Sequence, residues 1–215
     1  HNIMTPGDAP SVLVAMNPAA LKANLKDLPR GADLIVNTDE FTKRNLEKVG
    51  YPSNPIDAGS LDAYNVHAVA LTSMTVEALK GYAISKKDAE RAKNMYALGL
   101  LCWLYNRPSQ GTLDFLRSKF AKSPDIMNAN IAAYEAGWSF GETTEAFSVQ
   151  YEVAPASMPA GLYRNITGNP ALSLGLIAAS EISGLPLFLG SYPITPPPDI
   201  LHELSKPKNF VVMTF

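Results

Sequence analysis

The sequence holds few side chains of the types that usually carry catalysis or bind metal ions. It has three histidines, His1, His67 and His202, and a single cysteine, Cys102. One cysteine excludes an internal disulfide and any multi-cysteine zinc or iron–sulfur site within this chain. The motifs Gly-x-Gly-x-x-Gly and His-Glu-x-x-His and the Walker loop do not occur, so no cofactor or metal fingerprint is present. If the function needs an iron–sulfur cluster, that cluster must lie on a partner.

For each of these side chains a structural role is the simpler interpretation. His67 lies inside an apolar strand pattern, which favours a packing role. Cys102 lies in an apolar helical pattern, where a buried and inert thiol is expected. His202 follows a proline-rich loop and could face solvent, which leaves a functional role open beside the favoured structural one. The basic pair Lys86-Lys87 is most simply the solvated start of a helix.

The composition excludes several broad classes of protein. The chain has 215 residues, of which 47% are hydrophobic and 18% are charged, and its net charge is −2. These values disfavour a disordered chain and a nucleic-acid partner held by bulk positive charge. The best candidate for a membrane helix, residues 97–105, has about half of the roughly 18 apolar residues that such a helix needs. We therefore expect a soluble, cytoplasmic protein with one large domain or two small ones.

Residues 11–80 alternate short apolar runs with helical stretches. This alternation is typical of repeated β-α units and predicts a parallel sheet. The predicted strands are 11–16, 32–36 and 65–71. Asn17-Pro18 is a typical helix start after the first strand, and Asn37-Thr38-Asp39 is expected to cap the helix that follows the second.

From Ser85 the pattern stays helical for about 60 residues. A helix capped by Ser85 is apolar nearly all round over 94–105, which predicts burial against other helices or a partner. Two further helices are predicted over 110–122 and from Pro124 to about residue 147. Residues 150–160, with two prolines and several small residues, predict an extended connector and a domain boundary.

The last part of the chain returns to an α/β pattern. A helix of small and apolar residues is predicted over 171–183, in which Gly175 would let another backbone approach closely. A strand over 187–190 leads into a proline-rich loop, and a helix follows over 199–205. Ligands of open α/β sheets gather at the carboxyl ends of strands, and this loop lies at such an end.

The residues of this loop resemble a known enzyme family. Tyr192-Pro193-Ile194-Thr195-Pro196, preceded by Gly168-Asn169-x-Ala171 and followed by the run 199–204, resembles the α subunit of 2-oxoacid:ferredoxin oxidoreductases. Upstream, residues 12–17 are similar to a strand of the γ domain that is fused ahead of α in two-subunit members. The stretches 31–52 and 93–107 resemble members that act on 2-oxoglutarate. The resemblance extends over the whole chain and is most specific in its last 50 residues.

The resemblance implies an α/β fold in two parts. Residues 1–150 would be a γ-type domain with a helical extension, 151–165 a connector, and 166–215 the start of the α/β domain that binds the pyrimidine of thiamine diphosphate. It also implies sequence beyond both ends, with the glycine-rich opening of the γ domain before His1 and the cofactor-activating glutamate after Phe215.

The implied activity is the oxidative decarboxylation of 2-oxoglutarate to succinyl-CoA. Electrons would pass through a [4Fe–4S] cluster to ferredoxin, and the β subunit would hold that cluster together with the diphosphate and magnesium of thiamine diphosphate. Thr195 is the implied catalytic residue, beside substrate and cofactor. Tyr192 and Ile194 would shape the pocket, and Pro193 and Pro196 would stiffen the turn, which fixes the hydroxyl at low entropic cost. We expect a heteromer with the β subunit, α₂β₂, and no metal site within this chain.

One departure and two alternatives remain. The family commonly has small or hydroxyl residues after its Thr-Pro, whereas Pro197-Pro198 stand here and remove those donors. The loop does not reveal side-chain selectivity, so pyruvate or a branched 2-oxoacid is an alternative substrate. A non-catalytic assembly fragment that keeps the family's fold is the alternative from another class.

Overall fold

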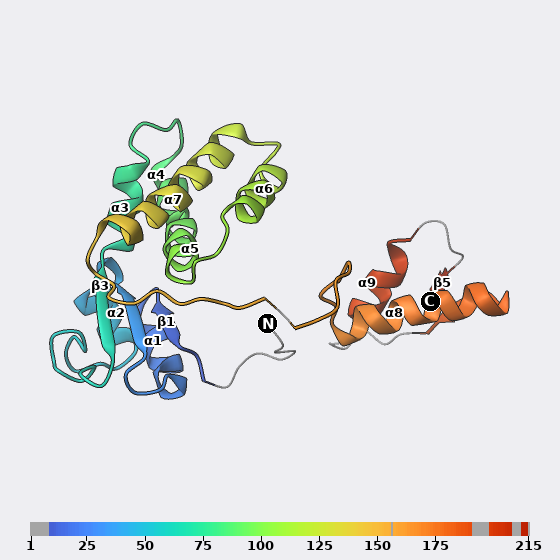
Figure 1. Ribbon diagram of the computed structural model, residues 1–215, viewed down its shortest axis with the longest axis horizontal. Helices are drawn as coiled ribbons and strands as arrows, with labels where there is room; N and C mark the ends of the chain where they lie inside the picture. Colours follow the sequence, from blue (N-terminus) through green and yellow to red (C-terminus); the bar gives the residue numbers. More distant parts are fainter. Residues whose placement is uncertain (1–8, 156, 191–197, 208–211, 215) are drawn as a thin grey trace. The chain divides into compact units, whose positions relative to one another are not determined.

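The computed structural model describes residues 9–155, 157–190, 198–207 and 212–214 (Figure 1). The chain divides into two compact units, His1–Ser157 and Met158–Phe215. The division point lies within the stretch 151–165, where a connector is predicted. Each unit contains a small parallel sheet and helices, which confirms the α/β fold class.

The sheet of the first unit has three parallel strands in the order β1-β2-β3. The strands are β1 (Val12–Ala15), β2 (Asp33–Asn37) and β3 (Asn65–Val69), and the helices after them are α1 (Pro18–Asn24), α2 (Lys43–Lys48) and α3 (Leu71–Ala78). Every residue of the central strand β2 is buried. Leu34 and Val36 pack into one apolar cluster and Ile35 into another, because successive side chains of a strand point to opposite faces. The three predicted strands are thus confirmed.

The helix caps follow the sequence at two places and depart from it at a third. Asn17 caps α1, with its Oδ1 accepting from the Ala20 amide at 2.9 Å. Ser85 caps α4 (Lys86–Arg91) in the same way. The cap predicted at Asn37-Thr38-Asp39 is wrong, because these residues lead into the short 3₁₀ helix η2 (Thr38–Glu40), and Thr42 caps α2 instead. Asn37 has no exposed surface, and its side chain bonds other segments.

The remaining helices of this unit are α4, α5 (Lys93–Leu104), α6 (Gln110–Lys119) and α7 (Pro124–Thr143), and a 3₁₀ turn, η1 (Leu25–Asp27), follows α1. The single helix predicted from Ser85 is broken at Ala92. This residue is both the C-cap of α4 and the N-cap of α5. The predicted helix from Pro124 ends at Thr143, four residues early. Figure 1 shows α5 and α7 side by side among these helices.

The contact between α5 and α7 depends on glycine. A Cβ on Gly99 would overlap the backbone carbonyl of Tyr134, and a Cβ on Gly137 would overlap that of Tyr96. The two helices therefore approach backbone to backbone. Because α7 and α3 cover the apolar surface of α5, this surface is buried within the chain and does not by itself call for a partner.

The prediction that Cys102 is fully buried is wrong. The residue is half-buried on α5, next to Tyr134, whose hydroxyl it contacts.

The second unit contains α8 (Gly168–Ser183), β4 (Leu187–Leu189), α9 (Pro198–Ser205) and β5 (Val212–Thr214), with β4 and β5 paired in parallel. The predicted helices and the predicted strand at 187–190 are confirmed. Gly184 ends α8 in the left-handed conformation, with φ of 66°, which glycine adopts without strain. Among the described residues of this unit only Ser173, Ile177 and Leu204 are buried.

Candidate functional site

The residues predicted to form the active site lie outside the described part of the chain. These are Tyr192, Pro193, Ile194, Thr195 and Pro196. β4 ends at Leu189 and α9 begins at Pro198, so the loop joins the carboxyl end of a parallel strand to a helix. This is the position at which α/β sheets bind ligands. The roles of the five side chains stay predictions.

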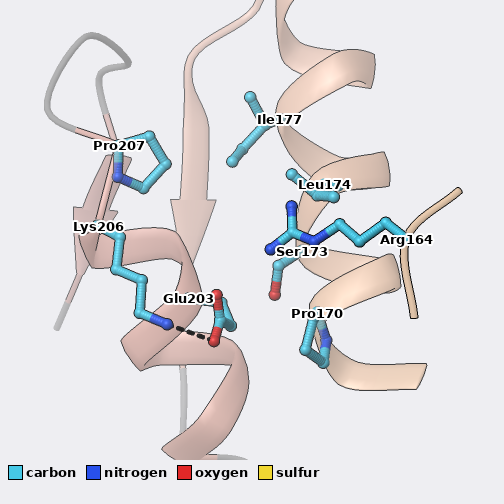
Figure 2. A pocket seen from close by; sticks show the side chains of 8 residues that line it. All are labelled: Arg164, Pro170, Ser173, Leu174, Ile177, Glu203, Lys206 and Pro207. Atoms are coloured by element: carbon cyan, nitrogen blue, oxygen red, sulfur yellow. Dashed lines mark hydrogen bonds and ion pairs between the residues drawn. The ribbon is translucent and has the colours of Figure 1, made fainter. Parts of the chain in front are cut away.

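A groove of about 330 Å³ lies between α8 and α9 in the second unit (Figure 2). Its lining combines three charged side chains, one hydroxyl and four apolar side chains: Arg164, Glu203, Lys206, Ser173, Pro170, Leu174, Ile177 and Pro207. The helix α8 supplies residues one turn apart, since positions i, i+3 and i+4 share a face. The sequence alone did not single out any of these side chains.

The lining of this groove has two positively charged side chains and one negatively charged side chain. Lys206 Nζ lies 2.6 Å from Glu203 Oε1, so the one carboxylate is already paired. Arg164 forms no hydrogen bond or ion pair with any residue that the structure describes, and Figure 2 shows its guanidinium reaching over Ser173 and Leu174. The groove therefore carries one net positive charge.

The hydroxyl in this groove is already engaged. Ser173 Oγ donates to the backbone carbonyl of Asn169 at 2.9 Å, and only 1% of the residue is exposed. Glu203, the one carboxylate of the lining, is paired with Lys206. With Ser173 bonded to the backbone, these described residues do not form a nucleophile and base pair.

His67 belongs to a buried hydrogen-bonded cluster in the first unit. Its Nε2 lies 2.9 Å from Asp33 Oδ1, and its ring stacks on Phe147 at 4.2 Å between centroids. The hydroxyl of Tyr151 donates to the other oxygen of Asp33. This hydrogen bond to Asp33, together with burial, raises the pKa of Tyr151 to about 12. The cluster fastens residues 147–151 to the start of β2 and the middle of β3, a structural role.

Polar residues at and just after the carboxyl end of β2 bond polar residues that follow β3, at the start of α3. Asp39 accepts from the Ser73 amide at 2.7 Å and from Ser73 Oγ at 2.6 Å. Asn37 Nδ2 donates to Thr72 Oγ1 at 3.1 Å. These bonds fix the start of α3 against the sheet, which explains why Asn37 and Asp39 do not cap the helix after β2.

The other candidates carry no site. His202 is exposed on α9, as expected, and does not line the groove. Within the described ranges, no group of three or more His, Cys, Asp or Glu side chains could hold a metal ion. None of the described helices is long and apolar enough to cross a membrane.

Comparison with known proteins places these features in a family. The family model for pyruvate ferredoxin/flavodoxin oxidoreductase matches residues 1–140. The 2-oxoglutarate oxidoreductase subunit KorA of Mycobacterium tuberculosis (strain ATCC 25618 / H37Rv) is 59% identical over 215 residues, which are 100% of this chain and 33% of that protein. The chain thus spans about one third of the length of this curated relative.

A solved structure shares the fold. It is described as 2-oxoglutarate:ferredoxin oxidoreductase from Magnetococcus marinus with 2-oxoglutarate, coenzyme A and succinyl-CoA bound, and it matches 100% of this chain and 33% of its own, with a TM-score of 0.69 and 20% identity. The resemblance seen in the sequence is confirmed at the level of the family. The chain belongs to the pyruvate ferredoxin/flavodoxin oxidoreductase family.

Proposed function

We propose that this chain is part of the subunit of a 2-oxoglutarate:ferredoxin oxidoreductase that combines a γ-type domain with the start of the α domain. The observation that carries the proposal is the 59% identity to KorA over all 215 residues. The matched residues cover both units of the chain. The reaction would be the coenzyme A-dependent oxidative decarboxylation of 2-oxoglutarate to succinyl-CoA, with the electrons passed to ferredoxin.

Thr195 is the proposed catalytic residue of this chain. The backbone of Thr195, between Ile194 and Pro196, is expected to be restricted by the prolines of the loop. Little conformational entropy would therefore be lost when its hydroxyl donates to the substrate carboxylate. Tyr192 and Ile194 would shape the pocket and hold the loop against it, and Pro193 and Pro196 would stiffen the turn. A charge-assisted hydrogen bond of this type orients the 2-oxoacid before its carboxylate leaves.

The proposed cofactors lie mainly outside this chain. Thiamine diphosphate would supply an electron sink for decarboxylation. In the part of the chain that the structure describes, no group of three or more His, Cys, Asp or Glu side chains could hold a metal ion. With one cysteine the sequence also provides no ligand set for a [4Fe–4S] cluster. The β subunit is therefore the proposed holder of both, in an α₂β₂ assembly in the cytoplasm.

The test uses the complete gene product co-expressed with its β subunit. Reduction of ferredoxin or a viologen dye should depend on 2-oxoglutarate and coenzyme A, and pyruvate should be a much poorer substrate. Equal or higher rates with pyruvate or a branched 2-oxoacid would replace the proposed substrate. Absence of activity with all three in a fully assembled complex would favour a non-catalytic assembly role.

The loop is tested by Thr195→Val, with Thr195→Ser as the matched control. Valine keeps the volume and β-branching but removes the hydroxyl, whereas serine keeps the hydroxyl. Loss of one charge-assisted bond of about 1.5 to 3 kcal/mol predicts a fall in kcat/KM of roughly 10-fold to 150-fold for the valine variant. Unchanged kinetics with valine would show that the loop is only a stiff turn.

A further inference from the structure

The groove between α8 and α9 has the chemistry of a binding site for a small anion with an apolar body. We propose that it binds a short aliphatic carboxylate, with the carboxylate on Arg164 and the hydrocarbon part against Leu174 and Ile177. The proposal concerns residues outside the loop 192–196 and does not depend on the proposed oxidoreductase reaction.

The cationic end of the site is Arg164. The residue is exposed and lines one side of the groove, and its guanidinium has no anionic partner among the described residues. The guanidinium presents parallel N–H donors that match the two oxygens of a carboxylate. Glu203 does not neutralise it, because its Oε1 is held by Lys206 at 2.6 Å.

The apolar part of the site follows from the spacing on α8. Pro170, Leu174 and Ile177 lie on one face of the helix, and Pro207 closes the groove from the other side. Leu174 is 50% exposed and Ile177 is 8% exposed, so a ligand could cover apolar surface that water now contacts. A cavity of about 330 Å³ is within the size range of small-molecule sites.

The lining distinguishes this ligand class from a bare anion. A free phosphate would use the charge of Arg164 but gain nothing from the four apolar side chains. A neutral aliphatic molecule would leave the guanidinium without a counter-charge. Only a ligand with both parts uses the whole lining.

The experiment is a titration of the complete gene product, labelled with ¹⁵N, with pentanoate, followed by NMR. We expect saturable shifts of the amides of residues 164, 171–177 and 203–206. Acetate, which lacks three methylene groups, should bind at least about fivefold more weakly, since each buried methylene is worth about 0.8 kcal/mol and the groove covers it only in part. Pentanamide and inorganic phosphate should also bind more weakly.

Two substitutions test the contacts. Arg164→Gln should weaken pentanoate binding about fivefold to tenfold, whereas Arg44→Gln, on α2 and outside the groove, should not. Leu174→Asp places a carboxylate in the groove and should abolish binding. Leu172→Asp is the matched control, because Leu172 lies on the same helix, is 51% exposed, and does not line the groove.

Several outcomes would overturn the proposal. They are pentanoate binding that is unchanged by Arg164→Gln, equal effects of the Leu174 and Leu172 substitutions, phosphate binding as tight as pentanoate, and shifts that do not saturate. Circular dichroism of each variant confirms that the fold is kept. Because the titration needs neither the β subunit nor turnover, its failure leaves the proposed oxidoreductase function untouched, and the reverse also holds.

Discussion

The two units of the chain are stabilised to very different degrees by burial of apolar side chains. The first unit contains three clusters of buried residues, and its central strand is completely buried. In the second unit only two apolar side chains, Ile177 and Leu204, are buried among the described residues. Hydrophobic burial is the main favourable term in folding, so the first unit has the larger share of it.

The exposed large apolar side chains are distributed just as unequally between the two units. Nine of the twelve exposed large apolar side chains of the described residues belong to the second unit, although it is much the shorter: Met158, Leu162, Tyr163, Ile166, Leu172, Leu174, Ile182, Leu185 and Phe188. Apolar exposure of this extent is unusual for a unit that is stable alone. A site in the second unit is therefore built on a scaffold with fewer buried apolar side chains than the first unit has.

The largest expected difference between the units is in large-to-small substitutions. Leu34 on β2 has no exposed surface, and Leu34→Ala should lower the free energy of unfolding of the first unit by about 3 to 5 kcal/mol. The equivalent change in the second unit, Leu172→Ala at a residue that is 51% exposed, should change it by less than about 0.5 kcal/mol.

Urea unfolding separates the two effects. Both tryptophans, Trp103 and Trp138, lie in the first unit, so their fluorescence follows its unfolding. A Leu34→Ala variant whose tryptophan transition does not move would contradict the contrast between the units.

The crossing of α5 and α7 should be the next most sensitive feature. Gly99→Ala places a methyl group on the carbonyl of Tyr134, so the helices must move apart, and we expect a loss of about 3 kcal/mol. Gly111→Ala on α6 is the control, because an added Cβ there meets nothing within 4 Å. It should stabilise the chain by about 0.5 kcal/mol, since alanine is the better helix former. Equal effects of the two changes on the urea midpoint would show that the close approach carries no energy.

The hydrogen bonds of tyrosine offer a third comparison. Tyr151 donates to Asp33, which is 8% exposed, and Tyr151→Phe leaves that carboxylate with one partner fewer. We expect a loss of about 1 to 3 kcal/mol, as for other hydrogen bonds to charged groups. Tyr163 in the second unit also donates, to the carbonyl of Pro159 at 2.7 Å, but it is 55% exposed. Water replaces that bond, so Tyr163→Phe should have no measurable effect on unfolding.

The pH dependence of the Tyr151→Phe effect has a definite sign. The hydrogen bond to Asp33 and burial raise the pKa of Tyr151 to about 12 in the folded chain, from its ordinary value of 10.0. The protonated hydroxyl is thus favoured by folding. Its contribution is fully present below the unfolded pKa and is lost as the pH rises through the folded pKa, that is, between about 10 and about 12. The difference in stability between wild type and Tyr151→Phe should shrink over this range, and a difference that grows with pH would refute the assignment.

The regular elements of the chain were largely predictable from sequence because their signals are local. Short apolar runs in the sequence predicted the strands that the structure has at 12–15, 33–37, 65–69 and 187–189. Asn17 and Ser85 correctly indicated where two helices begin. The exception at Asn37 has a physical reason. Its amide finds a partner in Thr72, 35 residues away, and a cap prediction considers only neighbours along the chain.

The sites were less predictable, because they depend on contacts between distant residues. Asp33 and Tyr151 are 118 residues apart, and nothing near either of them in sequence indicates that they meet. Arg164 carries no local signal, since its place in a groove formed by two helices, where no described residue pairs with it, follows only from the fold. The role of Thr195 came from resemblance to a family, and it stays a prediction because the loop lies outside the described residues.

The smallest expected effect concerns a glycine in the second unit. The sequence suggests that Gly175 on α8 permits another backbone to approach, yet among the described residues nothing lies within 4 Å of a Cβ built there. In the chain alone, Gly175→Ala should therefore gain about 0.5 to 1 kcal/mol, because alanine loses less backbone entropy in a helix and meets no neighbour. Helix content followed by circular dichroism during urea unfolding measures this gain. A loss of stability of the size expected for Gly99→Ala would show that a backbone does pack on this face of α8, and the contrast between a crowded first unit and an open second unit would fail at this position.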